Sequence, residues 1–211
     1  MNRIELIRAL RQEAGYSGSG PVSSTGAAGQ TKDLVDRIDQ AWLDLQNLSM
    51  WDWMWEQASI VIPAGSSVSA PTGVPASRYV IDSMRSPSGR MGYLSWREYQ
   101  ETVEPQLAEG IPAIWTVRPD MAVAVNALAP AGGLTLTVER YRSPVPFTSD
   151  TDVPALPEQF HYAIVWLAMT RIAAFDEAST RYVSSVRELN WMLGRMQNEQ
   201  TTLMQLGAPL A

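Results

Sequence analysis

Few side chains in this sequence have the types and spacing that catalysis requires. The chain holds one histidine, His161, and no cysteine, which excludes disulfides, thiolate metal sites and cysteine nucleophiles. A catalytic triad needs a base and an orienting acid beside a nucleophile, yet His161 lies inside an apolar stretch, so we interpret it as a structural residue. The sequence has no P-loop, GxGxxG fingerprint or histidine-based metal motif. We therefore expect no cofactor and no bound metal.

Paired carboxylates are the remaining candidates for chemistry. Two pairs have a spacing that glycoside hydrolysis could use, Glu98 with Glu101 and Asp33 with Asp36. Helix surfaces produce such spacings constantly, so the pairs are weak support for a hydrolase. Asp150 and Asp152 could suggest a cation site, but the glycine and distal glutamate of an EF-hand loop are missing around them. We favour a solvated loop there.

The elements that would position these residues are organised around the stretch 156–174. Pro157 suits the first turn of a helix, and Glu158 places negative charge near the positive end of the helix dipole. Two rows of apolar residues follow at helical spacing, Phe160, Ile164, Leu167 and Phe175 in one and Tyr162, Val165, Met169 and Ile172 in the other. This pattern predicts the central helix of an α-helical core. His161 and Arg171 interrupt it, so we expect no membrane span or anchor.

Two further helices are predicted before the central one. Residues 2–14 form a short amphipathic pattern, and a second helix starts near Thr31, a good N-cap residue. The second helix carries an apolar stripe that includes the core candidates Leu34, Ile38 and Trp42. Between the two helices, residues 16–29 are rich in glycine and serine. We interpret them as a flexible linker, with an arm that orders against a neighbouring subunit as the alternative.

The periodicity changes after Glu56. It moves towards two, proline and glycine become frequent, and five stretches read as strands: 58–62, 78–84, 113–117, 121–125 and 134–141. Ser95 to Glu98 matches a capping box and predicts a short helix among them. Residues 57–150 are therefore expected to form a small antiparallel β module inserted between helices.

A long helix is predicted after Asp176 and Glu177, extending to about Gln205. Its seam alternates by four and three residues: Tyr182, Val186, Leu189, Leu193, Met196, Gln200 and Leu203. Such a helix either lies across the helical core or projects to a partner. The expected fold is α+β: N-terminal helices in 1–56, the inserted β module in 57–150, and the central and long C-terminal helices with a short tail in 151–211.

The net charge of −6 argues against a broad basic surface that grips nucleic acid. It does not exclude a protein that lets DNA pass without holding it. The first residues show no signal-peptide pattern. The 45% hydrophobic fraction is ordinary for a folded protein, and with low charge the eight tryptophans suggest large buried surfaces.

Three segments in this order give the sequence a family resemblance. They are 6–21 (LIRALRQEAGYSGSGP), 29–46 (GQTKDLVDRIDQAWLDLQ) followed by tryptophans, and 156–169 (LPEQFHYAIVWLAM). With a β-rich middle, the chain resembles the head-to-tail adaptor proteins of tailed bacteriophages, also called head-completion or neck proteins.

The resemblance implies a structural virion protein made in the bacterial host cytoplasm, with no enzymatic activity. Such adaptors form a ring, commonly a dodecamer, under the portal protein; the ring extends the channel for double-stranded DNA and docks the next neck or tail protein. The C-terminal helix and tail typically embrace the portal, which here corresponds to residues 187–211. The implied contact residues are Trp191, Met192, Met196, Leu203, Met204 and Leu206. The alternatives are another neck or tail-completion protein, such as a stopper, or a virion-associated cell-wall hydrolase.

Overall fold

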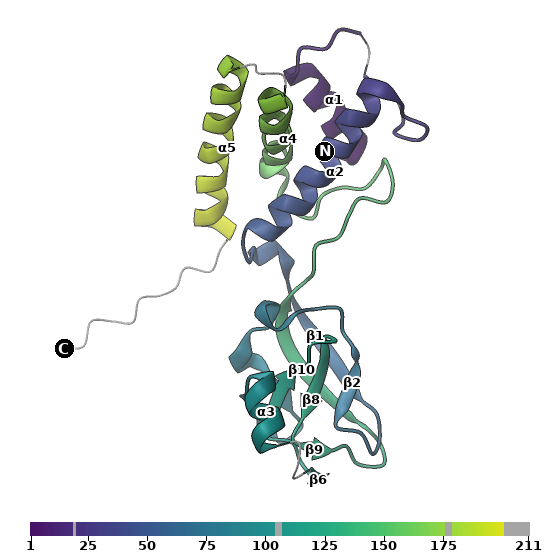
Figure 1. The fold of residues 1–211 in the computed structure, drawn as a ribbon, viewed down its shortest axis with the longest axis vertical. Helices are drawn as coiled ribbons and strands as arrows, with labels where there is room; N and C mark the ends of the chain where they lie inside the picture. The colour runs from purple at the N-terminus through teal and green to yellow at the C-terminus, as the bar shows by residue number, and fades with distance from the viewer. Residues whose placement is uncertain (19, 104–106, 176–178, 201–211) are drawn as a thin grey trace, which may run out of the picture. The chain divides into compact units, whose positions relative to one another are not determined.

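The computed structural model describes residues 1–18, 20–103, 107–175 and 179–200, and it contains two compact units (Figure 1). One unit is helical and comprises Met1–Trp53 and Pro144–Ala211; the other, Met54–Ser143, contains the strands. We call them the helical unit and the β unit. The fold is α+β. The sequence places the β module at 57–150, whereas the first strand already begins at Trp55 and residues 144–150 belong to the helical unit.

The helical unit contains four α-helices in its described residues. These are α1 (Arg3–Glu13), α2 (Gly29–Leu48), α4 (Tyr162–Phe175) and α5 (Ser179–Gln200). A capping box begins α1, because Asn2 accepts from the backbone of Glu5 while the Glu5 carboxylate accepts from the backbone of Asn2. Pro157 does not open an α-helix as expected; it precedes a 3-10 turn, η5 (Glu158–Phe160), that leads into α4.

Helix α4 is the centre of the helical unit. It contacts α1, α2 and α5, and Figure 1 shows it between α5 and the N-terminal helices. Neighbours on several sides explain why the apolar residues of α4 cover more than one face. Of the six residues proposed for the core, Leu34, Ile38, Trp42, Phe160 and Ile164 are buried, and Leu167 is half-buried.

Trp42 packs between two other aromatic rings of the helical unit. Its ring centroid lies 5.5 Å from that of Trp53 and 5.5 Å from that of Phe147, and both pairs are stacked. Nearby, the indole of Trp51 is buried and donates to the carbonyl of Leu45 at 2.6 Å. These contacts make Trp51 and Trp53 part of the core of the helical unit.

Helix α5 has 22 residues, a length of roughly 33 Å at ~1.5 Å per residue. Its fully buried line runs through Ser185, Leu189, Met192 and Met196. This line shares Leu189 and Met196 with the predicted seam, but Tyr182, the first seam residue, is exposed. The predicted continuation of the helix to Gln205, with Leu203, lies outside the described residues.

The β unit contains two four-stranded sheets and a two-stranded one. The first has the order β1-β10-β3-β4, from β1 (Trp55–Ile62), β10 (Leu134–Tyr141), β3 (Arg85–Ser86) and β4 (Gly89–Arg90). The second has the order β2-β8-β7-β5, from β2 (Val68–Pro71), β8 (Ala122–Val125), β7 (Ile114–Val117) and β5 (Gly92–Tyr93). The third pairs β6 (Ala108–Glu109) with β9 (Ala127–Leu128).

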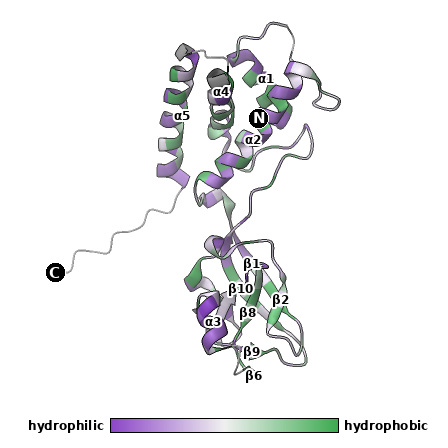
Figure 2. Ribbon diagram, viewed as in Figure 1, coloured by the Kyte–Doolittle hydropathy of each residue, from purple (hydrophilic) through white to green (hydrophobic). Residues whose placement is uncertain are grey.

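Two expectations for the β unit are wrong. The module is mixed rather than antiparallel, because β5 pairs with β7, and β6 with β9, in parallel. Residues 78–84 form no strand: they contain parts of two 3-10 turns, η2 (Ala76–Arg78) and η3 (Ile81–Ser83), with one isolated bridge from Tyr79 to Arg140. By contrast, α3 (Trp96–Thr102) begins at the predicted capping box, and this hydrophilic helix lies on the outside of the unit (Figure 2).

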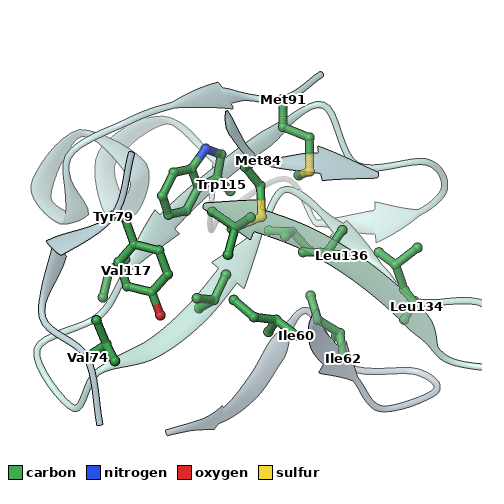
Figure 3. Packing of buried hydrophobic residues seen from close by; sticks show 14 residues of the cluster. Ile60, Ile62, Val74, Tyr79, Met84, Met91, Trp115, Val117, Leu134 and Leu136 are labelled. Carbon is green, nitrogen blue, oxygen red and sulfur yellow. The ribbon is translucent and has the colours of Figure 1, made fainter. Parts of the chain in front are cut away.

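One apolar cluster fills the β unit between the sheets (Figure 3). Trp115 is fully buried there, and the rings of Tyr79 and Tyr93 meet it edge-on with centroids 5.6 Å and 5.0 Å away. Alternating residues of β1 and β10, such as Ile60 and Leu136, point into the same cluster. The unit therefore has a hydrophobic core of its own.

Candidate interaction surfaces

The outer side of α5 presents an exposed tryptophan held in place by a cation. Trp191 keeps 57% of its surface exposed, and the Arg195 guanidinium carbon lies 5.1 Å from the centre of its ring. Arg195 also lies 5.6 Å from the Phe160 ring and 3.4 Å from the Glu199 carboxylate. A ring fixed in this way loses little side-chain entropy when a partner covers it, which is typical of an anchor residue.

The turn before α4 holds the C-terminal half of α5 in position. The Gln159 side chain donates to Glu199 at 2.7 Å, while Met192 and Met196 pack inside the helical unit. Among the described residues implied as portal contacts, Trp191 therefore faces solvent, and Met192 and Met196 are buried within the chain's own fold. Leu203, Met204 and Leu206 lie outside the described residues. Tyr182 and Val183, also exposed on α5, were not among the predicted contacts.

A polar network joins the beginning of α1 to two distant segments. The Arg3 side chain, 11% exposed, binds both carboxylate oxygens of Asp39 at 2.8 and 2.7 Å. Its remaining nitrogen lies 2.8 Å from Ser24 Oγ and 3.4 Å from Asp150 Oδ1. The hydrogen bond with Asp39 raises the pKa of Arg3. Hydrogen bonds from Ser24 and Ser23 lower the pKa of Asp150, so both partners stay charged.

The same network orders part of the glycine- and serine-rich segment. Ser23 and Ser24 bind Asp150 at 2.7 and 2.9 Å, and Arg8 Nε donates to the carbonyl of Pro21 at 2.9 Å. Arg11 donates to the carbonyl of Ser17. Arginines of α1 and Asp150 therefore bind part of this segment, which the flexible-linker interpretation did not include.

Asp152 forms hydrogen bonds within the loop before η5. Its carboxylate accepts hydrogen bonds from the backbone and hydroxyl groups of Thr148 and Ser149, which together lower its pKa far below the ordinary value. With Asp150 bound to Arg3, both carboxylates of the candidate cation site are occupied by protein donors. Within the described ranges, no cluster of three or more His, Cys, Asp or Glu side chains could hold a metal ion.

The carboxylates considered for glycoside hydrolysis are also committed to local structure. Glu98 closes the capping box of α3, and its hydrogen bonds with Ser95 lower the pKa of Glu98. A general acid in hydrolysis needs a raised pKa instead. Glu101 pairs with Arg97 at 3.2 Å, and Asp36 pairs with Lys32. Asp33 lines a surface cavity of about 410 Å³ beside Tyr16 and Arg37. Three of the four carboxylates are therefore engaged by neighbouring side chains, and the pKa of Glu98 is shifted in the direction opposite to the one a general acid needs.

His161 has the structural role that the sequence suggests. Its Nε2 lies 3.1 Å from the carbonyl of Leu156, and its Nδ1 lies 2.7 Å from the amino group of Met1. Burial lowers the pKa of His161, so the ring is neutral at pH 7, with Nε2 as donor and Nδ1 as acceptor. Both ring nitrogens are then satisfied, which leaves neither for a nucleophile.

A comparison with known protein families gives a match over nearly the whole chain. Among the helices that the structure describes, none has the length and apolar character needed to cross a membrane. No curated protein matches the sequence. The model of one protein family, described as SU10 adaptor protein, matches residues 1–208.

Proposed function

The chain belongs to the SU10 adaptor protein family, and from this membership we propose that it is a structural neck protein of a tailed phage. In the proposal it forms a ring of subunits, most simply a dodecamer, under the portal protein. The ring extends the DNA channel and offers its far side to the next neck or tail protein. The observation that carries the proposal is that the match spans both units and reaches residue 208.

We place the portal contact on the exposed side of α5 and on the chain that follows it. Trp191 supports this assignment, because it is large, exposed and held by Arg195 before any partner arrives. Met192 and Met196 would contribute to the contact indirectly, because these buried side chains fix α5 to the core. Leu203, Met204 and Leu206 remain proposed contacts in the segment after α5.

The charge of the chain supports passage of DNA rather than capture. With a net charge of −6, the protein has no excess of cations to neutralise phosphates, so sequence-specific or tight backbone binding is not expected. A channel wall of such subunits would repel DNA weakly and let it slide.

The test is the mass of the assembly, measured by light scattering after gel filtration for the protein alone and with the portal protein of the same phage. The proposal expects several copies to move onto the portal. A stable ring that forms without the portal and does not bind to it would favour a stopper or tail-completion protein further down the neck. A protein that stays monomeric in both samples would contradict the adaptor function.

The hydrolase alternative has less support, because Glu98 and Glu101 are engaged by Ser95 and Arg97. It predicts that the protein degrades peptidoglycan and that the variants Glu98→Gln and Glu101→Gln do not. Activity with that dependence would overturn the non-enzymatic assignment.

A further inference from the structure

Strand β1 leaves one complete edge of its sheet open. The N–H of Arg142 donates to the carbonyl of Met54 at 2.9 Å, in register with the pairing of Trp55 with Tyr141. Hydrogen-bonded and non-hydrogen-bonded pairs alternate along an antiparallel ladder. The even-numbered residues of β1 therefore bond to β10, whereas the odd-numbered ones direct both N–H and C=O away from it. The odd-numbered residues are Trp55, Gln57, Ser59 and Val61.

The far side of β10 confirms this alternation. The carbonyl of Glu139, which is paired with Gln57, accepts from Val80 at 3.0 Å, and its N–H donates to Ser83 Oγ at 2.9 Å. On the side of β1 the residues that the structure describes offer no equivalent partners: β1 is the terminal strand of its sheet, and none of them bonds these outward backbone groups. Eight residues of strand, roughly 26 Å at ~3.3 Å per residue, thus carry an open edge.

This edge lacks the features that normally prevent strand addition. Natural edges are protected by charged residues, proline or short length. The other edge strands of the two four-stranded sheets fit that rule, since β4 and β5 have two residues each and β2 contains Pro71. The outward-directed residues of β1 include no charge and no proline, and Trp55 and Val61 expose 45% and 62% of their surfaces.

A groove beside the edge could receive side chains of an added strand. A groove of about 290 Å³ runs between β1 and β2, lined by small polar or apolar side chains and one arginine: Ser59, Ile60, Val61, Ser69, Ala70, Thr72 and Arg140. An added strand would gain main-chain hydrogen bonds from the edge and could place its alternate side chains in this groove.

We propose that the open edge of β1 receives an extended segment of a second copy of this chain, so that the β units join side by side. The inference rests on the proposed ring and names one of its subunit contacts. Charge is compatible with this occupant: two copies of net charge −6 repel each other, so they can only meet at an uncharged surface, and the outward-directed residues of β1 carry no charge.

Amide hydrogen exchange tests the contact without any substitution. In the isolated subunit, the amides of Gln57, Ser59 and Val61 should exchange rapidly, while those of Ala58, Ile60 and Ile62 are protected by β10. In the assembled ring on its portal, the first set should slow by about tenfold or more, as one net hydrogen bond requires. The second set is the internal control. A ring in which the first set still exchanges at the rate of the isolated subunit would overturn the edge contact and leave the ring itself intact.

The occupant is identified by crosslinking. The chain has no cysteine, so Ser59→Cys carries a unique thiol for a photoreactive maleimide. A product with the mass of two copies supports the proposal; a product that contains the portal or another neck protein contradicts it. If no copies assemble on the portal at all, the proposed ring fails, and the edge contact fails with it.

A backbone variant gives an independent test. Ser59→Pro removes one outward N–H without touching the bonds to β10, and edge strands tolerate proline at such positions. We expect it to lose ring assembly, whereas Ser59→Ala assembles normally; assembly of both would overturn the proposal. Should Ser59→Pro fail to fold, Val61→Lys on the edge and Thr135→Lys, its cross-strand partner on β10, form a second pair. The first should block assembly and the second should not.

Discussion

The guanidinium group of Arg3 binds both carboxylate oxygens of Asp39, with Nε 2.8 Å from Oδ1 and Nη2 2.7 Å from Oδ2. The pair joins the first turn of α1 to the middle of α2, and the third guanidinium nitrogen reaches Ser24 in the segment between them. A two-bond geometry of this kind is specific to arginine. One residue therefore orders both helices and the polar connection between them.

Arg3→Ala should destabilise the helical unit by about 2–3 kcal/mol, the range for losing hydrogen bonds to a charged group that is mostly removed from water. Arg3→Lys should recover little of this, because an ammonium group cannot bind both oxygens. Urea unfolding with an unchanged m-value would measure the loss. Lys32→Ala, which breaks the exposed pair with Asp36, is the control and should change the midpoint little. Equal effects of the two alanine variants would contradict the role of Arg3.

Acid should weaken the loop before η5. Hydrogen bonds lower the pKa of Asp150 and that of Asp152 below their values in the unfolded chain, so the unfolded state binds more protons as the pH falls. Their contribution to the unfolding free energy is complete above pH about 4 and is lost progressively below it. Asp152→Asn should make the stability profile flatter in this range. A profile as steep as that of the parent protein would show that Asp152 contributes nothing.

His161 should give the unfolding free energy a second dependence on pH, at a higher pH than that of the two aspartates. Burial lowers its pKa, so protonation favours the unfolded chain, and stability should begin to fall as the pH drops below about 6.5. Stability falls in acid because the buried ring is neutral. If folding raised the pKa of His161 instead, the protein would become more stable in acid. His161→Gln should remove the slope between pH 7 and 5, measured by thermal unfolding. A stability that rises on acidification would contradict the neutral ring.

Trp191→Ala should weaken binding to the portal by at least about tenfold, or ~1.4 kcal/mol, without changing the unfolding midpoint much, because the ring is largely exposed. Ile111→Ala is the control, since it removes an exposed apolar side chain of the β unit that lies outside both α5 and β1. Titration of the portal followed by light scattering separates the two. Unchanged binding of Trp191→Ala would remove α5 from the proposed contact.

Local patterns predicted the elements whose causes are local. The capping box at Ser95 and Glu98 begins α3, and the alternation of β10 matches its buried and exposed faces. The apolar stripe of α2 likewise holds residues that are buried in the structure, such as Ile38. In each case the residues that decide the structure lie within a few positions of one another, which is the range that periodicity and capping describe.

Some failures involve partners that are distant in sequence. Pro21 and Ser24 of the glycine- and serine-rich segment are bound by Arg8, Arg3 and Asp150, and no composition rule for glycine and serine can include these partners. In 78–84 the backbone N–H groups of Arg78, Tyr79 and Ser83 donate to carbonyls three residues earlier, which closes 3-10 turns in place of a strand ladder. The predicted seam of α5 matches the buried line of that helix only in part. A strict seven-residue seam drifts by about 20° per heptad on a straight helix, so it included the exposed Tyr182 at one end of α5.

A destabilising substitution in the core of one unit should leave the stability of the other unit unchanged. Ile38 is fully buried in the helical unit, and Ile38→Ala should cost that unit about 2–4 kcal/mol through lost burial and a cavity. Because the β unit has its own cluster around Trp115, its slowest amides, such as those of β8 and β10, should keep their protection. Residue-resolved hydrogen exchange distinguishes the cases: acceleration confined to the helices of the helical unit supports two independent units. Equal acceleration in both units would show that they unfold as one, and the apolar clusters could then no longer be treated as separate cores.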